Sequence, residues 1–392
     1  MMNGTARHGG WRRWSARVAL LLAALTVAGM LGEVVVRLTP RLRVSMLTSR
    51  SDAALGEVYR PGQRARYSTP EYDHVVTINS HGQHDVEHTW AKPPGVFRIL
   101  FLGDSYVEAM QVPAEQVFYR RLEERLNEDA GAQGVRYETI GLGRSGWGPA
   151  QELVALEQIG WRYEPDLVVL CFLPDNDFVD SYRPLKRYPS MPYFERTPDG
   201  RLAPIPATPD GFKDSWVYSL CKRSQLVCLL RQNVDLLQQM RTDARRVPLR
   251  YQVFMEDKPA VWLDAIETTL ACVQRMEAVC RERGVGFLCV ALTSAVTLGQ
   301  VDLNAQAERY PAMRGVAFDP VWPYRLLEER LGGVMPYVSM VPTFEQYMAA
   351  TTRPLHFAKD GHWTVEGHAV AAAFLYEFLT GGKLLQSPAG TR

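Results

Sequence analysis

A serine, a histidine and a carboxylate from separate parts of the chain are of the types that together perform nucleophilic catalysis. Ser105 stands directly after the apolar run 99–102, Gly103 and Asp104. A serine hydroxyl becomes a good nucleophile only when a positioned base takes its proton and a third group orients that base. His362 is the candidate base, and Asp360 lies two residues before it, close enough to reach its imidazole from the same turn. Serine is also a preferred helix N-cap, so Ser105 alone is either a cap or a nucleophile.

Two further turns could supply hydrogen-bond donors to an oxyanion. The sequence GLGRSGWG, residues 141–148, and the sequence PDNDF, residues 174–178, each follow a predicted strand. A glycine N–H can approach a ligand closely because no side chain intervenes, and the side-chain amide of Asn176 is a neutral donor. His356 is a spare candidate base. His368 falls within a predicted helix, where we expect it to be packed or exposed.

Alternating strands and helices must position these residues. Apolar runs predict strands at 99–102, 136–142, 166–172, 286–292 and 337–341, and amphipathic or apolar stretches predict helices at 116–129, 149–161, 262–284 and 364–379. This alternation implies right-handed crossovers and a three-layer α/β/α fold with a parallel sheet of about five strands. Open sheets of this kind bind ligands at the carboxyl ends of their strands. The turns named above all lie at that edge.

The four blocks together resemble the SGNH (GDSL-type) hydrolase superfamily. GDS follows the first strand, glycine the second and Asn-Asp the third, and Asp-x-His precedes the last helix, in this order over residues 103–362. The stretch INSHGQHDVEH, residues 78–88, also resembles membrane-anchored bacterial members. The resemblance implies a flavodoxin-like sheet with Ser105 as nucleophile and His362 as general base, oriented by Asp360.

The resemblance also implies an oxyanion hole. Its donors would be the N–H of Ser105, the N–H of Gly146, with Gly143 as the fallback, and the amide of Asn176. Two features depart from the commonest family pattern. The acid and the base are spaced as D-x-H rather than D-x-x-H, a form seen in relatives that O-acetylate polysaccharides, and GRSGWG carries arginine and tryptophan where small or polar residues are common.

The function implied is a serine esterase that hydrolyses an acyl ester, such as an O-acetyl ester, on a carbohydrate or another envelope substrate through an acyl-enzyme on Ser105. Two alternatives stay open. The first is an O-acyltransferase that modifies an extracytoplasmic polysaccharide with the same residues. The second is a non-catalytic glycan-binding protein of the same fold. We expect no cofactor and no metal, and the oligomeric state stays open.

The N-terminus predicts a membrane anchor. Four arginines precede an apolar run at 18–36, which is interrupted only by Glu33 near its end, and about 20 such residues suffice to span a bilayer. A cleaved signal peptide is the alternative. Basic residues ahead of the run favour an amino end inside the cell. We therefore expect a single-pass inner-membrane protein with its catalytic domain in the periplasm or outside.

The predicted organisation is a cytoplasmic tail at 1–17, the transmembrane anchor at 18–36 and an extended membrane-proximal segment at 37–95. The hydrolase domain follows at 96–382 with an insertion at about 181–259, and a tail occupies 383–392. The proline-rich first part of the insertion is expected to be mostly loop, and its second part to be helical. This insertion could wall the substrate site, because loops leaving this edge of a sheet commonly shape access to it.

Several other functions are disfavoured. A formal net charge of +1 over 392 residues, with no basic stripe, gives no sign of nucleic-acid binding. His81, His84 and His88 are dense enough to ligate a metal, but no second ligand cluster follows, so we expect a solvated polar loop there. GLGRSG matches a dinucleotide fingerprint but lacks the acidic residue expected after the next strand. The six cysteines are expected to be small buried residues, without a catalytic thiol.

Overall fold

A five-stranded parallel sheet forms the centre of the protein. The structure is a computed structural model that describes residues 7–39, 42, 44, 47–130, 135–243, 245–382 and 384–385. The strands are β5 (Val96–Gly103), β6 (Arg136–Gly143), β7 (Leu167–Phe172), β10 (Gly286–Ala291) and β11 (Tyr337–Ser339). All neighbours pair in parallel, in the order β11-β10-β7-β5-β6. The predicted α/β class and five-stranded parallel sheet are thereby confirmed.

The strand order fixes where a ligand can bind. Numbered along the chain, the five parallel strands lie in the order 2-1-3-4-5, which is the flavodoxin-like arrangement. The connections leave in opposite directions from the neighbours β5 and β7. A crevice therefore opens at their carboxyl ends. Ser105 and Asn176 follow these two strands directly.

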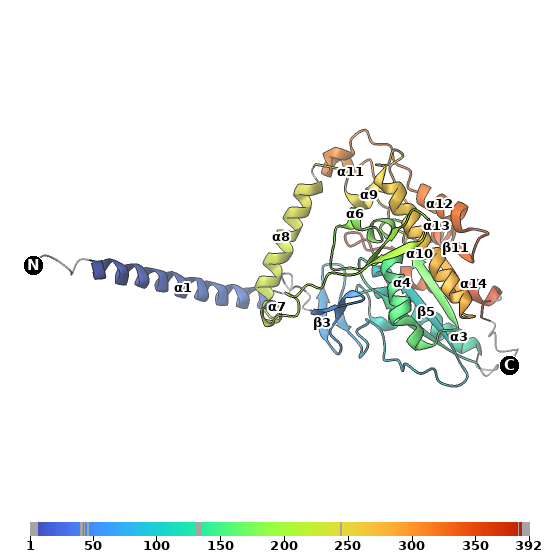
Figure 1. The fold of residues 1–392 in the computed structure, drawn as a ribbon, viewed down its shortest axis with the longest axis horizontal. Helices are drawn as coiled ribbons and strands as arrows, with labels where there is room; N and C mark the ends of the chain where they lie inside the picture. Colours follow the sequence, from blue (N-terminus) through green and yellow to red (C-terminus); the bar gives the residue numbers. More distant parts are fainter. Residues whose placement is uncertain are drawn as a thin grey trace, which may run out of the picture.

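Helices cover both faces of the sheet (Figure 1). Alternate residues of β5 point to opposite sides, as in any strand. Leu100 and Leu102 join the core beneath α4 (Pro149–Gln158), α10 (Val261–Glu282) and α12 (Trp322–Leu331). Ile99 and Phe101 join the core beneath α3 (Phe118–Ala130), α13 (Val341–Ala350) and α14 (Val365–Gly381). These two apolar layers hold the strand ends that carry the candidate site. Short helices outside the insertion include α2 (Ser105–Glu108), α5 (Asp177–Asp180) and α11 (Gln306–Arg309).

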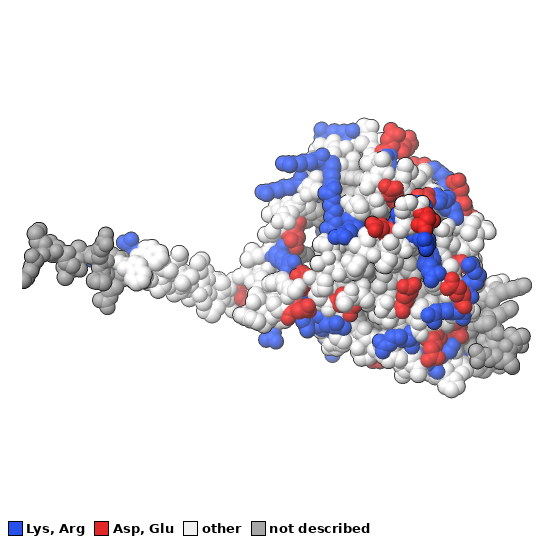
Figure 2. Space-filling view, in the orientation of Figure 1, with Lys and Arg blue, Asp and Glu red and all other residues white. Residues whose placement is uncertain are grey.

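A long helix, α1 (Arg7–Leu38), projects from the globular part (Figure 1). Its segment Arg13–Leu38 is long and apolar enough to cross a membrane, a property that N-terminal signal sequences share. Figure 2 shows charged side chains spread over the globular part, whereas the described part of the α1 rod is nearly free of them. Two antiparallel hairpins follow α1, formed by β1 (Ser49–Asp52) with β2 (Gly56–Tyr59) and by β3 (Arg64–Ser68) with β4 (Asp73–Thr77). Most of the predicted tails, residues 1–6 and 386–392, lie outside the described residues.

The stretch 79–92 is an irregular, partly buried segment, so the loop was predicted correctly, but the prediction that it is solvated is wrong for His84 and His88. His84, Asp85 and His88 are all less than 9% exposed. Asp85 accepts a hydrogen bond from the backbone N–H of Gly141 in β6 at 2.9 Å. Because β6 lies at the edge of the sheet, its free backbone groups need such partners. The polar residues of this stretch are therefore buried by covering an exposed strand edge.

The insertion contains more regular structure than its prolines suggest. Between α6 (Arg183–Lys186) and α7 (Trp216–Cys221) the chain forms a hairpin of β8 (Tyr193–Arg196) and β9 (Leu202–Ile205), where mostly loop was predicted. Proline is tolerated on an edge strand because a donor facing solvent is not needed there, and Pro204 lies in β9 of this two-stranded hairpin. The second part forms α7 and α8 (Gln225–Asp243), as predicted for the helical run 217–240, and α9 (Leu249–Gln252) follows beyond that run.

Candidate active site

Ser105 begins α2 at the carboxyl end of β5. Asp104, not Ser105, is the N-cap of this helix: its Oδ1 accepts a hydrogen bond from the N–H of Tyr106 at 2.8 Å. The sequence left open whether Ser105 is a cap or a nucleophile, and the capping function belongs to its neighbour. The Ser105 hydroxyl is thereby left available for another partner.

Three side chains form a continuous hydrogen-bonded chain at this edge. Ser105 Oγ lies 2.7 Å from His362 Nε2, and His362 Nδ1 lies 2.6 Å from Asp360 Oδ1. Ser105 comes from the end of β5, whereas the other two residues come from the loop before α14, 257 residues away for the histidine. The structure thus brings together the three residues that the sequence singled out. A histidine in this position can accept the serine proton while its other nitrogen is oriented by the carboxylate.

The turn between β3 and β4 supports Asp360 from the other side. Tyr72 donates its hydroxyl proton to Asp360 Oδ2 at 2.9 Å. Glu71 accepts the backbone N–H groups of Lys359 and Asp360 at 2.9 and 3.0 Å. Burial alone would raise the pKa of the Asp360 carboxyl, but the hydrogen bonds from His362 and Tyr72 outweigh it and hold that pKa below its ordinary value. Asp360 is therefore kept ionised beside the histidine.

His362 has two further neighbours that the sequence analysis missed. The side-chain amide nitrogen of Gln111 lies 3.1 Å from His362 Nδ1. The ring of Tyr106 lies 5.0 Å from the imidazole, and its hydroxyl donates to the carbonyl of Gly361 at 3.1 Å. Gly361 has a φ of +87°, which glycine adopts without strain. These contacts fix the turn that carries the histidine.

The candidate oxyanion donors lie around Asp104 and the turn after β6. The Asn176 side-chain amide donates to Asp104 Oδ2 at 3.0 Å, and the hydroxyl of Ser105 lies 3.4 Å from the same oxygen. Asp104 thus holds the side chains of Asn176 and Ser105 next to each other. Gly146 has a φ of +80°, whereas a side chain at Gly143 would collide with Val107 of α2. The close packing of α2 against β6 accounts for the glycine at 143, and Gly146 lines the same cavity as Asn176.

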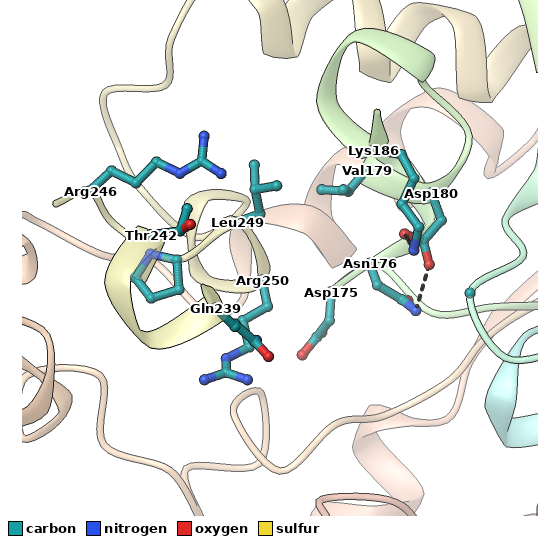
Figure 3. Close-up of a pocket in the computed structure, with 12 residues that line it drawn as sticks. Asp175, Asn176, Val179, Asp180, Lys186, Gln239, Thr242, Arg246, Leu249 and Arg250 are labelled. Atoms are coloured by element: carbon teal, nitrogen blue, oxygen red, sulfur yellow. Dashed lines mark hydrogen bonds and ion pairs between the residues drawn. The ribbon is translucent and has the colours of Figure 1, made fainter. Parts of the chain in front are cut away.

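Gly146 and Asn176 line one cavity of about 560 Å³. One side of this cavity comes from the sheet edge and α5, with Asp175, Val179, Asp180 and Lys186. The other side comes from the insertion, with Gln239, Thr242, Arg246, Leu249 and Arg250 (Figure 3). The insertion therefore does wall a cavity beside the candidate oxyanion donors. Basic side chains from the insertion face acidic ones from the sheet edge.

The acidic groups of this cavity are perturbed by burial. Burial raises the pKa of Asp175 to about 7 and that of Asp180 to about 6, although the Lys186 ammonium 2.6 Å from Asp180 acts in the opposite direction. Behind them, burial raises the pKa of Glu152 and of Asp177 well above the ordinary range. The sequence analysis did not single out these residues. Only the Asn-Asp block after β7 pointed to their neighbourhood.

Three other histidines, His356, His368 and His88, have partners outside the Ser105–His362–Asp360 chain. His356 is buried, with Nε2 3.4 Å from the carbonyl of Thr293, and His368 is buried in α14, where it accepts the N–H of Phe118 at 3.3 Å. His88 lies between Asp85 and Glu138, at 3.1 and 2.8 Å. Among the described residues, no group of three or more His, Cys, Asp or Glu side chains is placed to hold a metal ion.

Comparison with known proteins gives structural matches only. No family model matches the chain, and no curated protein matches it. A two-domain esterase active on acetylated mannans aligns with 14% identity over 75% of this chain and 51% of its own, at a TM-score of 0.37, so this chain spans about half the length of that protein. The acetyl xylan esterase AlAXEase aligns with 12% identity over 72% of this chain and 100% of its own, at a TM-score of 0.37.

A member of the lipolytic protein G-D-S-L family from Veillonella parvula aligns with 10% identity over 72% of this chain and 98% of its own, at a TM-score of 0.34. The interpretation of the site therefore depends on its own geometry.

Proposed function

We propose that the chain is a serine esterase of the SGNH type, which hydrolyses an acyl ester through an acyl-enzyme on Ser105. The observation that carries this proposal is the hydrogen-bonded chain from Ser105 through His362 to Asp360, with distances of 2.7 and 2.6 Å. Its position at the carboxyl ends of β5 and β7, where the strand order reverses, supports the same conclusion.

Acylation of the enzyme follows from these contacts. Ser105 Oγ attacks the ester carbonyl and forms a tetrahedral intermediate while its proton passes to His362 Nε2. Asp360 stabilises the resulting imidazolium. The oxyanion receives hydrogen bonds from the N–H groups of Ser105 and Gly146 and from the amide of Asn176. His362 then gives the proton to the leaving alcohol, and the acyl group stays on the serine.

Deacylation uses the same groups in the reverse roles. Water takes the place of the alcohol, His362 removes its proton, and the hydroxide attacks the acyl carbonyl. Collapse of the second tetrahedral intermediate releases the carboxylic acid and returns the proton to Ser105. We propose O-acetyl groups on a carbohydrate or another envelope substrate as the natural esters. This substrate class follows from the family resemblance of the four sequence blocks and from the proposed location outside the membrane that α1 would cross.

The reaction is tested with the purified full chain on p-nitrophenyl acetate. We expect Ser105→Ala to lower kcat/KM by at least about 10³-fold, the scale of losing a triad member. The matched control is Ser80→Ala. Ser80 is exposed, and its hydroxyl binds Glu87 rather than a residue of the candidate active site, so this variant should keep the rate of the unmodified chain. An unchanged rate in the Ser105 variant would refute the proposal.

The fate of the acyl group separates hydrolysis from transfer. We expect free acetate to form at the same rate with and without an added oligosaccharide acceptor. Covalent labelling of the full chain by a fluorophosphonate, mapped by mass spectrometry, should place the label on Ser105. Acetate release that requires the acceptor would instead identify an acyltransferase, and absence of both label and turnover would favour a non-catalytic glycan-binding protein.

A further inference from the structure

Helix α8 exposes a row of large apolar side chains that nothing in the described chain covers. Its residues 231–242 are all exposed. Six apolar side chains of this helix are between 40% and 57% exposed: Val227, Leu230, Val234, Leu236, Leu237 and Met240. A helix of a soluble domain normally turns such residues toward a core. Exposed apolar patches of this kind mark surfaces that contact another partner.

Most of the apolar and polar residues of α8 occupy opposite halves of the helix, and Asn233 and Arg241 are the polar residues on the apolar half. At about 3.6 residues per turn the six apolar side chains fall on one half of its circumference. The other half carries Arg231, Gln232 and Asp235, which line a cavity of about 330 Å³ between α8 and the body together with Glu57 and Lys213. Farther along the same half, Gln239 and Thr242 line the cavity of the candidate active site. The polar half therefore faces the body. Of the six apolar residues Val227 also lines the first of these cavities, and the other five face away from the body.

The start of α8 is fastened to α1. Glu33 of α1 accepts hydrogen bonds from the backbone N–H groups of Gln225 and Leu226, both at 2.9 Å, and from the hydroxyl of Ser224 at 2.7 Å. Arg37 of α1 donates to the carbonyl of Arg223 at 2.7 Å. Figure 1 shows α8 running crosswise to α1 along the side of the body from which α1 projects. A bilayer crossed by α1 would thus lie on the side that α8 faces.

We propose that the apolar half of α8, together with α7, rests on the lipid bilayer that α1 crosses. This inference goes beyond the esterase proposal and rests on α1 as a membrane anchor. An amphipathic helix lying in the interface buries its apolar half at the boundary of the headgroups and acyl chains. The short helix α7 at the junction adds Trp216, 76% exposed, and Leu220, 57% exposed. Tryptophan is enriched at this level of the membrane.

Basic residues at the carboxyl end of α8 are also suited to contact with the bilayer. Arg241 and Arg245 are exposed at and just after the end of this helix. Figure 2 shows basic side chains extending from this part of the molecule, at its upper left. Basic residues close to an anionic lipid surface each add to its attraction. The apolar row and the basic end together match a bilayer that contains anionic lipid better than they match an apolar protein surface.

The proposal is tested on the full chain in vesicles of phosphatidylethanolamine and phosphatidylglycerol that contain a phospholipid with a diazirine on its acyl chain. After irradiation and proteolysis, labelled peptides are identified by mass spectrometry. We expect label in α1 and also in the peptides that cover 216–240. Label in α1 alone would overturn the proposal, and absence of label from both helices would overturn both the anchor and the proposal.

A pair of variants with equal added charge makes the test specific to one side of α8. Leu230→Asp with Leu237→Asp should lower labelling of α8 at least about fivefold, because a charge is costly in the apolar layer, while labelling of α1 stays constant. Gln232→Asp with Gln238→Asp places the same charge on the polar half and should leave the labelling of α8 unchanged. Thermal unfolding of both variants shows that the fold persists. Equal labelling of α8 in the two variants would contradict the proposal.

Discussion

The contact between Tyr72 and Asp360 extends the candidate active site beyond the three residues that the sequence pointed to. The tyrosine hydroxyl lies 2.9 Å from the carboxylate oxygen that does not face His362. Its hydrogen bond helps to keep the pKa of Asp360 below its ordinary value. Tyr72 is thus a positioning residue, since it acts on the reaction only through the acid that orients the base.

We predict that Tyr72→Phe lowers kcat for ester hydrolysis about tenfold, the scale of a hydrogen bond to a charged group, and leaves KM nearly constant. Without the tyrosine hydroxyl the pKa of Asp360 rises, so the acid limb of the rate profile should move to higher pH. Both effects are measured from steady-state kinetics between pH 3 and pH 9, a range that begins below the ordinary pKa of Asp.

Tyr376→Phe is the matched control for this variant, because Tyr376 also donates its hydroxyl to a carboxylate, that of Asp129, in a different part of the fold. It should change neither kcat nor the pH profile. A Tyr72 variant with an altered KM and an unmoved acid limb would show that the tyrosine shapes substrate binding instead.

There is a physical reason why the sequence indicated the three residues of the hydrogen-bonded chain but not Tyr72 and Glu71. Ser105, Asp360 and His362 each stand beside a turn at the end of a predictable element, so their meeting point follows from the topology of a parallel sheet. Tyr72 and Glu71 lie 288 residues before their partners, on a hairpin with no chemical signal of its own. Only the folded chain shows that the hairpin of β3 and β4 supports the loop of the candidate base.

At the scale of elements, the stretch 79–92 joins the uncovered edge of β6 to the body. Within it, His88 lies between Asp85 at 3.1 Å and Glu138 at 2.8 Å, and Glu138 also binds the buried Arg98 at 2.7 Å. Burial alone would lower the pKa of His88, but the hydrogen bonds to Asp85 and Glu138 outweigh it and raise that pKa to about 9. The protonated form of this histidine is therefore the one that stabilises the fold.

We predict that His88→Gln destabilises the protein in a pH-dependent way. The folded-state pKa lies above the unfolded value, so the contribution of His88 is fully present below about pH 6.5 and disappears as the pH rises through about 9. The loss in the free energy of unfolding should be roughly 3 kcal/mol at pH 6 and small at pH 10. Denaturant unfolding of both proteins at these two pH values measures it.

His84→Gln provides the opposite case within the same stretch. Burial lowers the pKa of His84, so protonation of this histidine in the unfolded state costs the native protein stability as the pH falls. Its replacement should therefore improve relative stability toward acid pH, after any loss that does not depend on pH is subtracted. If His88→Gln lost the same free energy at pH 6 and pH 10, the protonated network would not be the source of its effect.

The sheet and its main helices were predictable because their apolar periods are local. The strand predicted at 166–172 is apolar from Leu167 onward, and the structure places β7 at Leu167–Phe172 in the middle of the sheet. The hairpin of β8 and β9 and the burial of 79–92 were not predictable. In the hairpin, Tyr193 and Phe194 pack in a hydrophobic core formed by residues that are distant in the sequence. His84 and His88 are buried because their stretch covers the edge of β6. The hairpin and the burial of 79–92 both depend on tertiary contacts, which a local sequence pattern does not indicate.

At the scale of the whole molecule, Glu33 connects the projecting helix to the wall of the candidate active site. From the sequence alone, a carboxylate near the end of the apolar run 18–36 has no evident function. In the structure it binds the first N–H groups of α8 and so acts as the cap of that helix, from a different part of the chain. Because α8 ends beside the cavity of Gly146 and Asn176, the joint between α1 and α8 also holds one wall of that cavity.

We predict that Glu33→Ala loosens α8 without unfolding the domain. The loss of a cap costs about 0.5 to 2 kcal/mol, so amide hydrogen exchange in the peptides covering 225–243 should accelerate roughly two- to thirtyfold in the full chain in vesicles. Exchange in β5 and β7 should stay constant, because these strands are held by separate contacts. Glu33→Gln, which keeps one acceptor oxygen, should give an intermediate rate. If the alanine variant left the exchange of α8 unchanged, the helix would be held by its contacts with lipid or with the body, and Glu33 would not be its cap.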